Sequence, residues 1–352
     1  MLLALAAGSG RPSLAAAARR IAGSARVEEV ELAGVPATLY RPARDALPLP
    51  GVVVLPGVTR QGRRHPAFVG AGTGLAAAGV LAAVVEPRGL SIGELTPDVL
   101  ARTHAAVEAF ASDPERAGSL ALAGVSGGAT LALALAGAPA LAARVSAVLA
   151  LSPLCDIREA LRLVTTDRYR RQGALVPFRP GSFLRLVLAR SAIAWLEDGP
   201  DRRTLRQHVL ELDDYGAEPL RAFRSWPLDE LGREARGIVR LLANDDPSRF
   251  DELYGALPDD LHETVGLLSP LRVAGDVRAP VELVVAREDK YVPLADAVAL
   301  ASACPKARMT VLDSLEHAVP RVSPGAARDL ARLDGALVRF LSAVRSPSYS
   351  RG

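Results

Sequence analysis

The chain has 352 residues, of which 49% are hydrophobic and 23% are charged. This length can bury a large core, and the composition is that of an ordinary globular protein, which excludes a disordered or fibrous chain. The 42 basic and 39 acidic side chains leave a formal net charge of only +3. We therefore expect no nucleic-acid partner, and we interpret the basic segments 167–172 and 201–207 as solvent-exposed helix faces.

Cysteine usage and the first residues bear on the cellular compartment. Cys155 and Cys304 are far apart and lack the spacing of a metal or redox motif, so we expect two free, buried thiols. The apolar run at residues 2–7 has no preceding positive charge, is short for the apolar part of a signal peptide and is much too short for a membrane span. We expect a cytoplasmic protein without a membrane span and with an N-terminal extension at residues 1–25, a truncated leader being the alternative.

Strand and helix patterns alternate along the chain. Residues 26–32 and 35–40 alternate polar and apolar side chains across an Ala-Gly turn, which predicts a β-hairpin. Helices are predicted after Pro66, after Thr96 as the N-cap, and after Gly128. The alternation predicts an α/β fold with a mostly parallel, doubly wound sheet. Short apolar runs predict strands that are covered on both faces at 51–56, 80–85, 118–124, 145–151, 281–286 and 309–313.

Residues 156–270 interrupt this alternation. The stretch has helical periodicity, Pro and Gly breaks and charge, but no convincing buried strand. We expect a helical insertion with its own apolar surface, which leaves residues 26–155 and 271–345 as the sheet domain. The insertion holds nine of the fifteen aromatic residues, namely Tyr169, Phe178, Phe183, Trp195, Tyr215, Phe223, Trp226, Phe250 and Tyr254.

One serine lies among glycines between a predicted strand and a predicted helix. Gly124, Ser126 and Gly128 form a G-x-S-x-G pattern there, which is the context of a nucleophile elbow. The serine of such a turn has a strained backbone, and its neighbours must be small because strand and helix approach closely. The alternative is a glycine-rich turn without catalytic use.

A serine hydroxyl is a weak nucleophile, so it needs a base and a group that orients the base. Of the five histidines, His317 lies in a polar loop just after a predicted strand, and Glu288 and Asp289 follow another strand. Each residue alone is equally typical of a surface loop. Together, Ser126, Asp289 and His317 follow the carboxyl ends of three strands, where open α/β sheets build their sites.

These motifs resemble those of the α/β-hydrolase superfamily over roughly residues 27–344, the insertion excepted. GVSGG at 124–128 resembles its nucleophile elbow, REDKYVP at 287–293 its acid loop, and LEHAVP at 315–320 its histidine loop. Residues 268–285 resemble the lead-in to the penultimate strand in the dienelactone-hydrolase-like and acyl-peptidase-like branches. The resemblance implies a helical cap or lid at the insertion, Ser126 as nucleophile, His317 as general base and then acid, and Asp289 as the orienting carboxylate.

Two positions depart from the pattern of this superfamily. Many members carry His-Gly at the end of the third strand, whereas Pro56 stands in place of the histidine here. An oxyanion hole uses backbone N–H groups, so Val58 and Gly127 remain the implied donors. Ala286 stands where the acid loop usually has glycine, which leaves Glu288 as a second candidate for the carboxylate.

A serine activated by a histidine suits acyl transfer through an acyl-enzyme. The sequence therefore predicts a serine hydrolase that cleaves a carboxylic ester of a small, uncharged, hydrophobic molecule. A serine acyltransferase, a peptidase or a cofactor-free haloperoxidase of the same fold is an alternative, and so is a non-catalytic binding protein. No H-E-x-x-H, P-loop or dinucleotide motif occurs in the sequence, so we expect no metal, nucleotide or redox cofactor.

Residues 176–195 of the insertion carry more apolar side chains than one helix face needs for packing. Pockets for small ligands are mostly apolar. We therefore expect part of this segment to line an acyl or alcohol site, with Phe183, Leu186 and Trp195 as candidates. The alternative is that the aromatic residues form only the core of the insertion.

Overall fold

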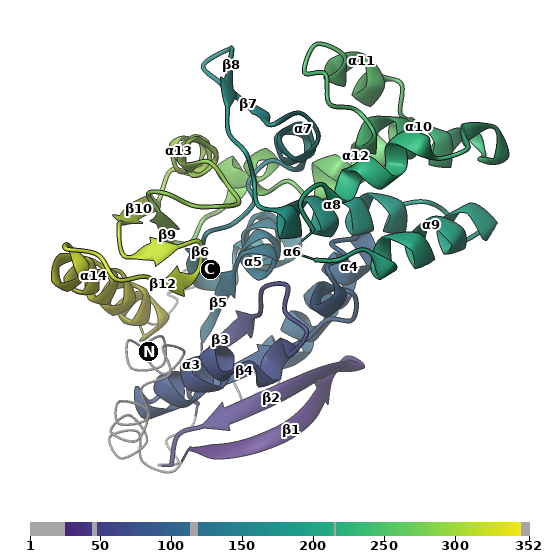
Figure 1. Ribbon diagram of the computed structural model, residues 1–352. Helices are drawn as coiled ribbons and strands as arrows, with labels where there is room; N and C mark the ends of the chain where they lie inside the picture. The colour runs from purple at the N-terminus through teal and green to yellow at the C-terminus, as the bar shows by residue number, and fades with distance from the viewer. Residues whose placement is uncertain (1–24, 44–47, 113–118, 215, 346–352) are drawn as a thin grey trace.

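An eight-stranded sheet lies at the centre of the protein in the computed structural model (Figure 1), which describes residues 25–43, 48–112, 119–214 and 216–345. The strand order is β1-β2-β4-β3-β5-β6-β9-β10. β2 runs antiparallel to β1 and β4, and every other neighbouring pair is parallel. The predicted α/β class is confirmed. The strands are β1 (Arg26–Leu32), β2 (Val35–Arg41), β3 (Pro50–Leu55), β4 (Leu81–Val85), β5 (Ser119–Val125), β6 (Val145–Leu151), β9 (Val281–Ala286) and β10 (Ala307–Leu312).

The central strands are buried on both faces, as their apolar runs predict. Every residue of β4 and β9 is buried, and β3 is buried from Gly51 onward. The predicted hairpin at the edge is also present, because Ala33 and Gly34 both take positive φ angles, of 48° and 76°. Such a turn matches the twist of the two strands it joins.

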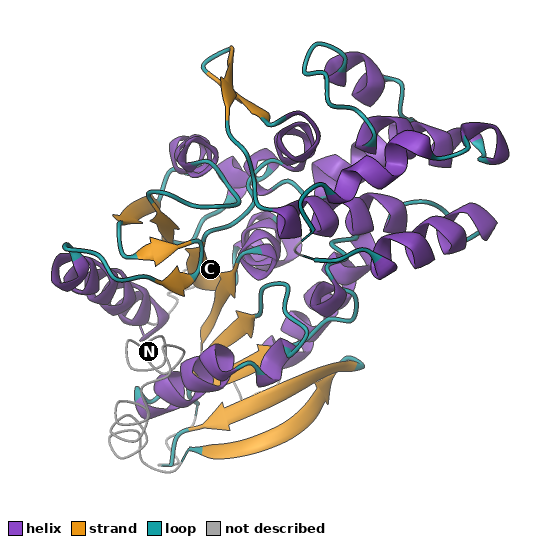
Figure 2. Cartoon of the chain, in the orientation of Figure 1, coloured by secondary structure: helices purple, strands orange, loops and turns teal. Residues whose placement is uncertain are grey.

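Helices cover both faces of the sheet (Figure 2). α3 (Pro66–Ala77) and α14 (Ala326–Arg345) pack on one face. The opposite face is covered by α4 (Pro97–Ala111), α5 (Gly127–Gly137) and α13 (Leu294–Ala303). The predicted cap of α4 is present, since the hydroxyl of Thr96 accepts a hydrogen bond from the N–H of Val99 at 3.2 Å. A single turn, α6 (Pro139–Ala142), leads into β6.

Helices also fill the stretch between β6 and β9, where the sequence predicts an insertion. In Figure 1 they lie together on one side of the molecule. Their buried side chains belong to the same continuous apolar core as those of α4, α5 and α13, so these helices pack directly against the helices that cover the sheet. The helices are α7 (Ile157–Thr166), α8 (Ser182–Ala194), α9 (Pro200–Glu211), α10 (Arg233–Leu242), α11 (Phe250–Gly255) and α12 (Asp259–Leu267).

The interpretation of residues 167–172 as a helix face is wrong. The segment opens an exposed hairpin of β7 (Arg168–Arg171) and β8 (Ala174–Pro177). Asp167 ends α7 with a φ of 55°, and Gln172 and Gly173 take positive φ angles of 49° and 86°, which form the turn. A run of charged residues is compatible with either an exposed helix or an exposed strand, so charge alone did not distinguish them. The second basic segment, 201–207, does lie in α9.

The expectation of two free, buried thiols is confirmed for Cys155 and Cys304. Burial raises the pKa of the Cys155 thiol well above its ordinary value. Among the described residues, no helix is long and apolar enough to cross a membrane. The apolar run at residues 2–7 lies outside the described residues.

Candidate active site

Ser126 occupies the sharp turn between β5 and α5. Its backbone has φ 52° and ψ −123°, which a side-chain-bearing residue rarely adopts, and its N–H donates to the carbonyl of Leu151 at 2.8 Å. The flanking glycines are required by close backbone approach. A Cβ on Gly124 would lie 2.4 Å from the carbonyl oxygen of Gly128, and one on Gly128 would lie 2.2 Å from that of Leu55.

His317 lies in a tight turn between β11 (Leu315–Glu316) and β12 (Val319–Pro320). Its φ of 58° again marks a strained residue. The hydroxyl of Ser152, just after β6, donates to the carbonyl oxygen of His317 at 2.9 Å. The ring of Tyr291 packs edge-on against the imidazole, with centroids 4.9 Å apart. These contacts fix both the backbone and the ring of His317.

Asp289 is the carboxylate that contacts His317. Its Oδ2 lies 2.8 Å from Nδ1 of the imidazole, and its Oδ1 accepts hydrogen bonds from the N–H groups of Tyr291 at 2.8 Å and Val292 at 3.2 Å. The side chain of Asp289 is only 4% exposed. Since Nδ1 faces Asp289, Nε2 is the ring nitrogen of His317 that remains available to a group in the pocket.

Glu288 points elsewhere. Its side chain is 73% exposed and pairs with Arg321 at 3.0 Å. Of the two carboxylates that the sequence leaves open, Asp289 is therefore the one beside the histidine.

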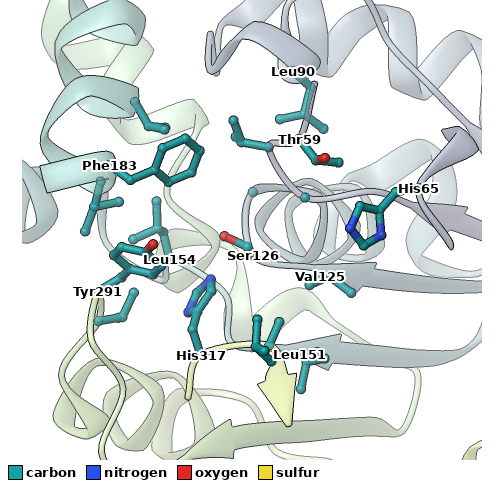
Figure 3. A pocket seen from close by; sticks show the side chains of 18 of the residues that line it. Thr59, His65, Leu90, Val125, Ser126, Leu151, Leu154, Phe183, Tyr291 and His317 are labelled. Carbon is teal, nitrogen blue, oxygen red and sulfur yellow. The ribbon is translucent and has the colours of Figure 1, made fainter. Parts of the chain in front are cut away.

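Ser126 and His317 both line one pocket of about 250 Å³ (Figure 3), and the figure shows both side chains at its centre. α8 contributes Phe183, Leu184 and Val187 to its wall. The other two candidates from the sequence lie elsewhere. Leu186 is fully buried in the core, and the indole N–H of Trp195 donates to the carbonyl of Leu95 at 2.8 Å. The structure thus places Phe183, but neither Leu186 nor Trp195, in the pocket wall.

Val58 and Gly127 line the same pocket from two neighbouring segments. Gly127 is the first residue of α5, so its N–H has no acceptor within the helix and points toward the helix N-terminus. A Cβ on Gly127 would lie 3.7 Å from a methyl carbon of Val58, and one on Gly57 would lie 3.0 Å from the carbonyl oxygen of Val125. The loop after β3 therefore rests against the turn that carries Ser126, which brings both sequence-predicted N–H donors to one edge of the pocket.

The wall of this pocket carries no fixed charge. No Asp, Glu, Lys or Arg is among the described residues that line it, and burial lowers the pKa of His65 below its ordinary value. His65 is also the N-cap of α3, with Nδ1 accepting from the N–H of Ala67 at 3.2 Å. No group of three or more His, Cys, Asp or Glu suited to a metal ion occurs in the part of the chain that the structure describes.

Sequence reasoning missed several residues that shape the site. Tyr291 and Ser152 hold His317, and His65 and Phe68 line the pocket. For two of them the position in the sequence indicates a place near the site. Ser152 directly follows a predicted strand, and Tyr291 lies two residues after Asp289 in the acid loop. His65 and Phe68 belong to a segment whose place over the pocket depends on tertiary packing.

No protein-family model and no curated protein sequence matches the chain. Solved structures do resemble it. The chain is similar to Est1E from Butyrivibrio proteoclasticus, with a TM-score of 0.51 and 12% identity over 91% of this chain and 100% of that one. It is similar to the acylaminoacyl peptidase of Pyrococcus horikoshii, with a TM-score of 0.52 and 13% identity over 94% of this chain. It is also similar to DphMB1, with a TM-score of 0.50 and 19% identity over 94% of this chain and 91% of that one.

The chain spans only 43% of the length of that peptidase. At these identities the comparisons establish the fold and nothing finer.

Proposed function

Because the chain has the α/β-hydrolase fold, we propose that it is a serine hydrolase that cleaves carboxylic esters of uncharged, hydrophobic molecules through an acyl-enzyme. The observation that carries the proposal is that Ser126, in a strained turn, and His317, paired with Asp289 at 2.8 Å, line one apolar pocket. Strained serines in such turns and carboxylate-oriented histidines are the parts that acyl transfer needs.

In the proposed reaction His317 acts first as a base. Nε2 takes the hydroxyl proton of Ser126 while Oγ forms a bond to the ester carbonyl carbon. The carbonyl oxygen becomes an oxyanion, which the N–H groups of Val58 and Gly127 stabilise. One such donor typically contributes on the order of a hundredfold to a thousandfold in rate.

The imidazolium then acts as an acid. It donates its proton to the alcohol oxygen as the bond between that oxygen and the carbonyl carbon breaks, and the acyl group stays on Ser126. Water, deprotonated by His317, attacks the acyl-enzyme and releases the carboxylic acid and free Ser126. Asp289 keeps the proton of the neutral imidazole on Nδ1 and stabilises the imidazolium without itself taking up a proton.

The preference for uncharged substrates follows from desolvation. A charged ester would bury its charge against a wall without a charged partner among the described residues, which is unfavourable. Residues 156–270 serve in this proposal as a cap whose helix α8 forms part of that wall, over a catalytic domain made of residues 26–155 and 271–345.

The test combines turnover with covalent labelling. The wild-type protein should hydrolyse p-nitrophenyl esters and react with a fluorophosphonate, whereas Ser126→Ala should lose both, with turnover falling on the order of a millionfold. Ser302→Ala, an exposed serine of α13, is the matched control and should retain both. Labelling that persists in Ser126→Ala, or a wild-type protein that cleaves no ester, would overturn the proposal.

The same assay separates the related activities. Adding a small alcohol tests for acyl transfer, since a transferase would form the new ester faster than the free acid. An N-acetyl-alanine p-nitroanilide tests for peptidase activity. Cleavage of the anilide at a rate equal to that of the matching ester would favour a peptidase over an esterase.

A further inference from the structure

A second, smaller cavity lies behind the strand that leads to Ser126. It has a volume of about 90 Å³ and sits between the sheet and the two helices α3 and α14. All of the described residues that line it are apolar. They come from β3, β5, β6 and β9 on the sheet side and from α3 and α14 on the other, and they include Ala71, Leu75, Ala123, Leu337 and Phe340.

This cavity adjoins the pocket of Ser126. Four residues line both spaces, namely Ala67, Phe68, Val125 and Leu151. Val125 directly precedes Ser126, and the carbonyl of Leu151 accepts the N–H of Ser126 at 2.8 Å. The partition between the two spaces is therefore made of apolar side chains immediately beside the nucleophile.

The cavity exists because small residues stand where larger ones would close the gap. Ala71 on α3 and Ala123 on β5 both line it. Protein interiors are otherwise close-packed, and an apolar void destabilises the fold around it. A cavity lined only by apolar side chains can accept an apolar guest.

The direction of the leaving group decides which part of an ester would reach this cavity. His317 must protonate the departing alcohol, so the alcohol lies on the side of the imidazole. Tyr291 packs on that imidazole, and Phe183 contacts Tyr291 with ring centroids 6.1 Å apart. Figure 3 shows Phe183 and Tyr291 on one side of Ser126, and Val125 and His65 on the other. The acyl group therefore extends toward Val125, which borders the cavity.

We propose that the cavity behind β5 is an acyl-chain subsite, which receives the end of an unbranched alkyl chain that passes from Ser126 between Phe68 and Leu151. This inference rests on the proposed ester hydrolysis and names its substrate class as esters of linear, medium-length fatty acids. About 90 Å³ holds on the order of three methylene-sized groups. Each buried methylene raises kcat/KM by about fourfold, so the cavity accounts for a preference of several tens of fold over a chain that ends in the first pocket.

The test fills the cavity from α3. Ala71→Leu adds three carbon atoms to a residue that lines it. The ratio of kcat/KM for p-nitrophenyl octanoate to that for the acetate should fall at least tenfold. Ala77→Leu is the matched control, because it makes the same change at an exposed position of the same helix, and it should leave the ratio within about twofold of the wild type. Urea unfolding of both variants checks that each is folded.

A second variant moves the effect in the opposite direction. Leu337→Ala, on the neighbouring helix α14, enlarges the cavity and should shift the preferred acyl chain to greater length. A series of alkyl acetates, which vary only the alcohol, should respond little to Ala71→Leu. Equal ratios for Ala71→Leu and Ala77→Leu, or a response confined to the alkyl acetates, would overturn the acyl subsite.

These outcomes separate the two proposals. If the wild-type protein hydrolyses the acetate and is labelled at Ser126, but Ala71→Leu leaves the chain-length profile unchanged, only the subsite is wrong. If the wild-type protein cleaves no ester and takes up no label, the proposed hydrolysis fails and the acyl subsite falls with it.

Discussion

Nδ1 of His317 lies 2.8 Å from Oδ2 of Asp289, whereas Glu288, the residue before it, turns to solvent and pairs with Arg321. We expect Asp289→Asn to lower kcat about ten-thousandfold, because the amide stabilises the wrong tautomer of the imidazole. Glu288→Gln breaks only an exposed ion pair and should change kcat less than twofold. Steady-state kinetics of both variants is the measurement, and a large loss in Glu288→Gln with a small one in Asp289→Asn would move the carboxylate by one residue.

The sequence predicts the sheet and its edge hairpin well, because short buried strands and the Ala33–Gly34 turn are local features. It predicts the order of Ser126, Asp289 and His317 for a similar reason, since each lies within four residues of the end of a predicted strand. The resemblance favours Asp289 over Glu288, but the spacing of the residues alone does not separate these two neighbours. Neighbouring residues of a loop point in different directions, and only the contacts of Oδ1 with the N–H groups of Tyr291 and Val292 decide which one turns inward.

The sequence predicts the pocket wall only in part, since Phe183 lines the pocket and Leu186 and Trp195 do not. All residues of α8 from Leu184 to Ala194 are buried, so the helix has no exposed face from which its orientation could be read. Even Arg185 and Arg190 are buried, because carboxylates of Asp167 and Asp214 reach them. The packing of α8 against the rest of the protein decides which of its apolar side chains line the pocket.

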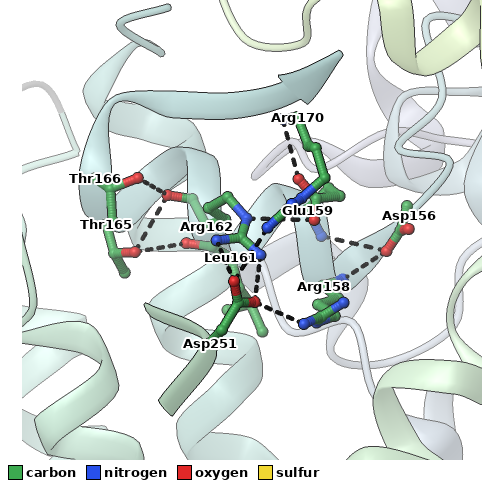
Figure 4. A network of polar contacts seen from close by, with 9 residues as sticks. All are labelled: Asp156, Arg158, Glu159, Leu161, Arg162, Thr165, Thr166, Arg170 and Asp251. Atoms are coloured by element: carbon green, nitrogen blue, oxygen red, sulfur yellow. Dashed lines mark hydrogen bonds and ion pairs between the residues drawn. The ribbon is translucent and has the colours of Figure 1, made fainter. Parts of the chain in front are cut away.

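A buried arginine in the insertion supports the next prediction (Figure 4). The side chain of Arg162 is fully buried, donates to Asp251 at 2.6 Å and lies over the ring of Phe250 at 4.3 Å. Asp251→Ala leaves this charge without its closest partner, and because Asp251 is 49% exposed and Glu159 remains beside Arg162, the free energy of unfolding should fall by about 1 to 3 kcal/mol. Urea unfolding measures the loss.

Two variants test whether the loss of stability comes from the unpaired charge of Arg162 and not from the removal of a carboxylate as such. Asp198→Ala breaks an exposed pair with Arg203 and should cost no more than about 1 kcal/mol. The double variant Asp251→Ala and Arg162→Met removes both charges and should recover part of the stability. A single Asp251→Ala variant as stable as the wild type would show that Glu159, 3.3 Å from Arg162, suffices to hold the charge.

Stability should also depend on pH through Asp296. Burial raises the pKa of this carboxyl to about 7, while one of its oxygens accepts the N–H of Cys155 at 2.9 Å. The unfolded chain releases this proton near pH 4. The stabilising contribution of Asp296 to the free energy of unfolding is therefore fully present below pH 4 and is lost as the pH rises through 7. Above pH 7 it does not change further. Asp296→Asn should stabilise the protein at pH 8 by on the order of 2 kcal/mol, since the residue borders a cavity and keeps some contact with solvent.

The measurement for Asp296 is the difference in unfolding free energy between variant and wild type at pH 4 and pH 8. Asn retains the acceptor for the N–H of Cys155, so the difference isolates the charge. The advantage of Asp296→Asn should grow with pH, and Asp198→Asn, at an exposed site, should show no such growth. A pH-independent difference would mean that folding does not shift the pKa of the Asp296 carboxyl.

Phe183 should set the preference for the alcohol part of the substrate. It lines the pocket from α8 and contacts Tyr291, which packs on His317. Phe183→Ala removes apolar surface from the side where the alcohol leaves, so kcat/KM for benzyl acetate should fall on the order of tenfold relative to that for methyl acetate. Phe178→Ala is the matched control, because Phe178 is similarly half-buried but packs on Tyr169 outside the pocket. Leu186→Ala and Trp195→Phe should lower the unfolding temperature without changing the ratio of kcat/KM for benzyl acetate to that for methyl acetate. If Phe183→Ala lowers kcat/KM equally for both acetates, Phe183 only stabilises the packing of residues 156–270.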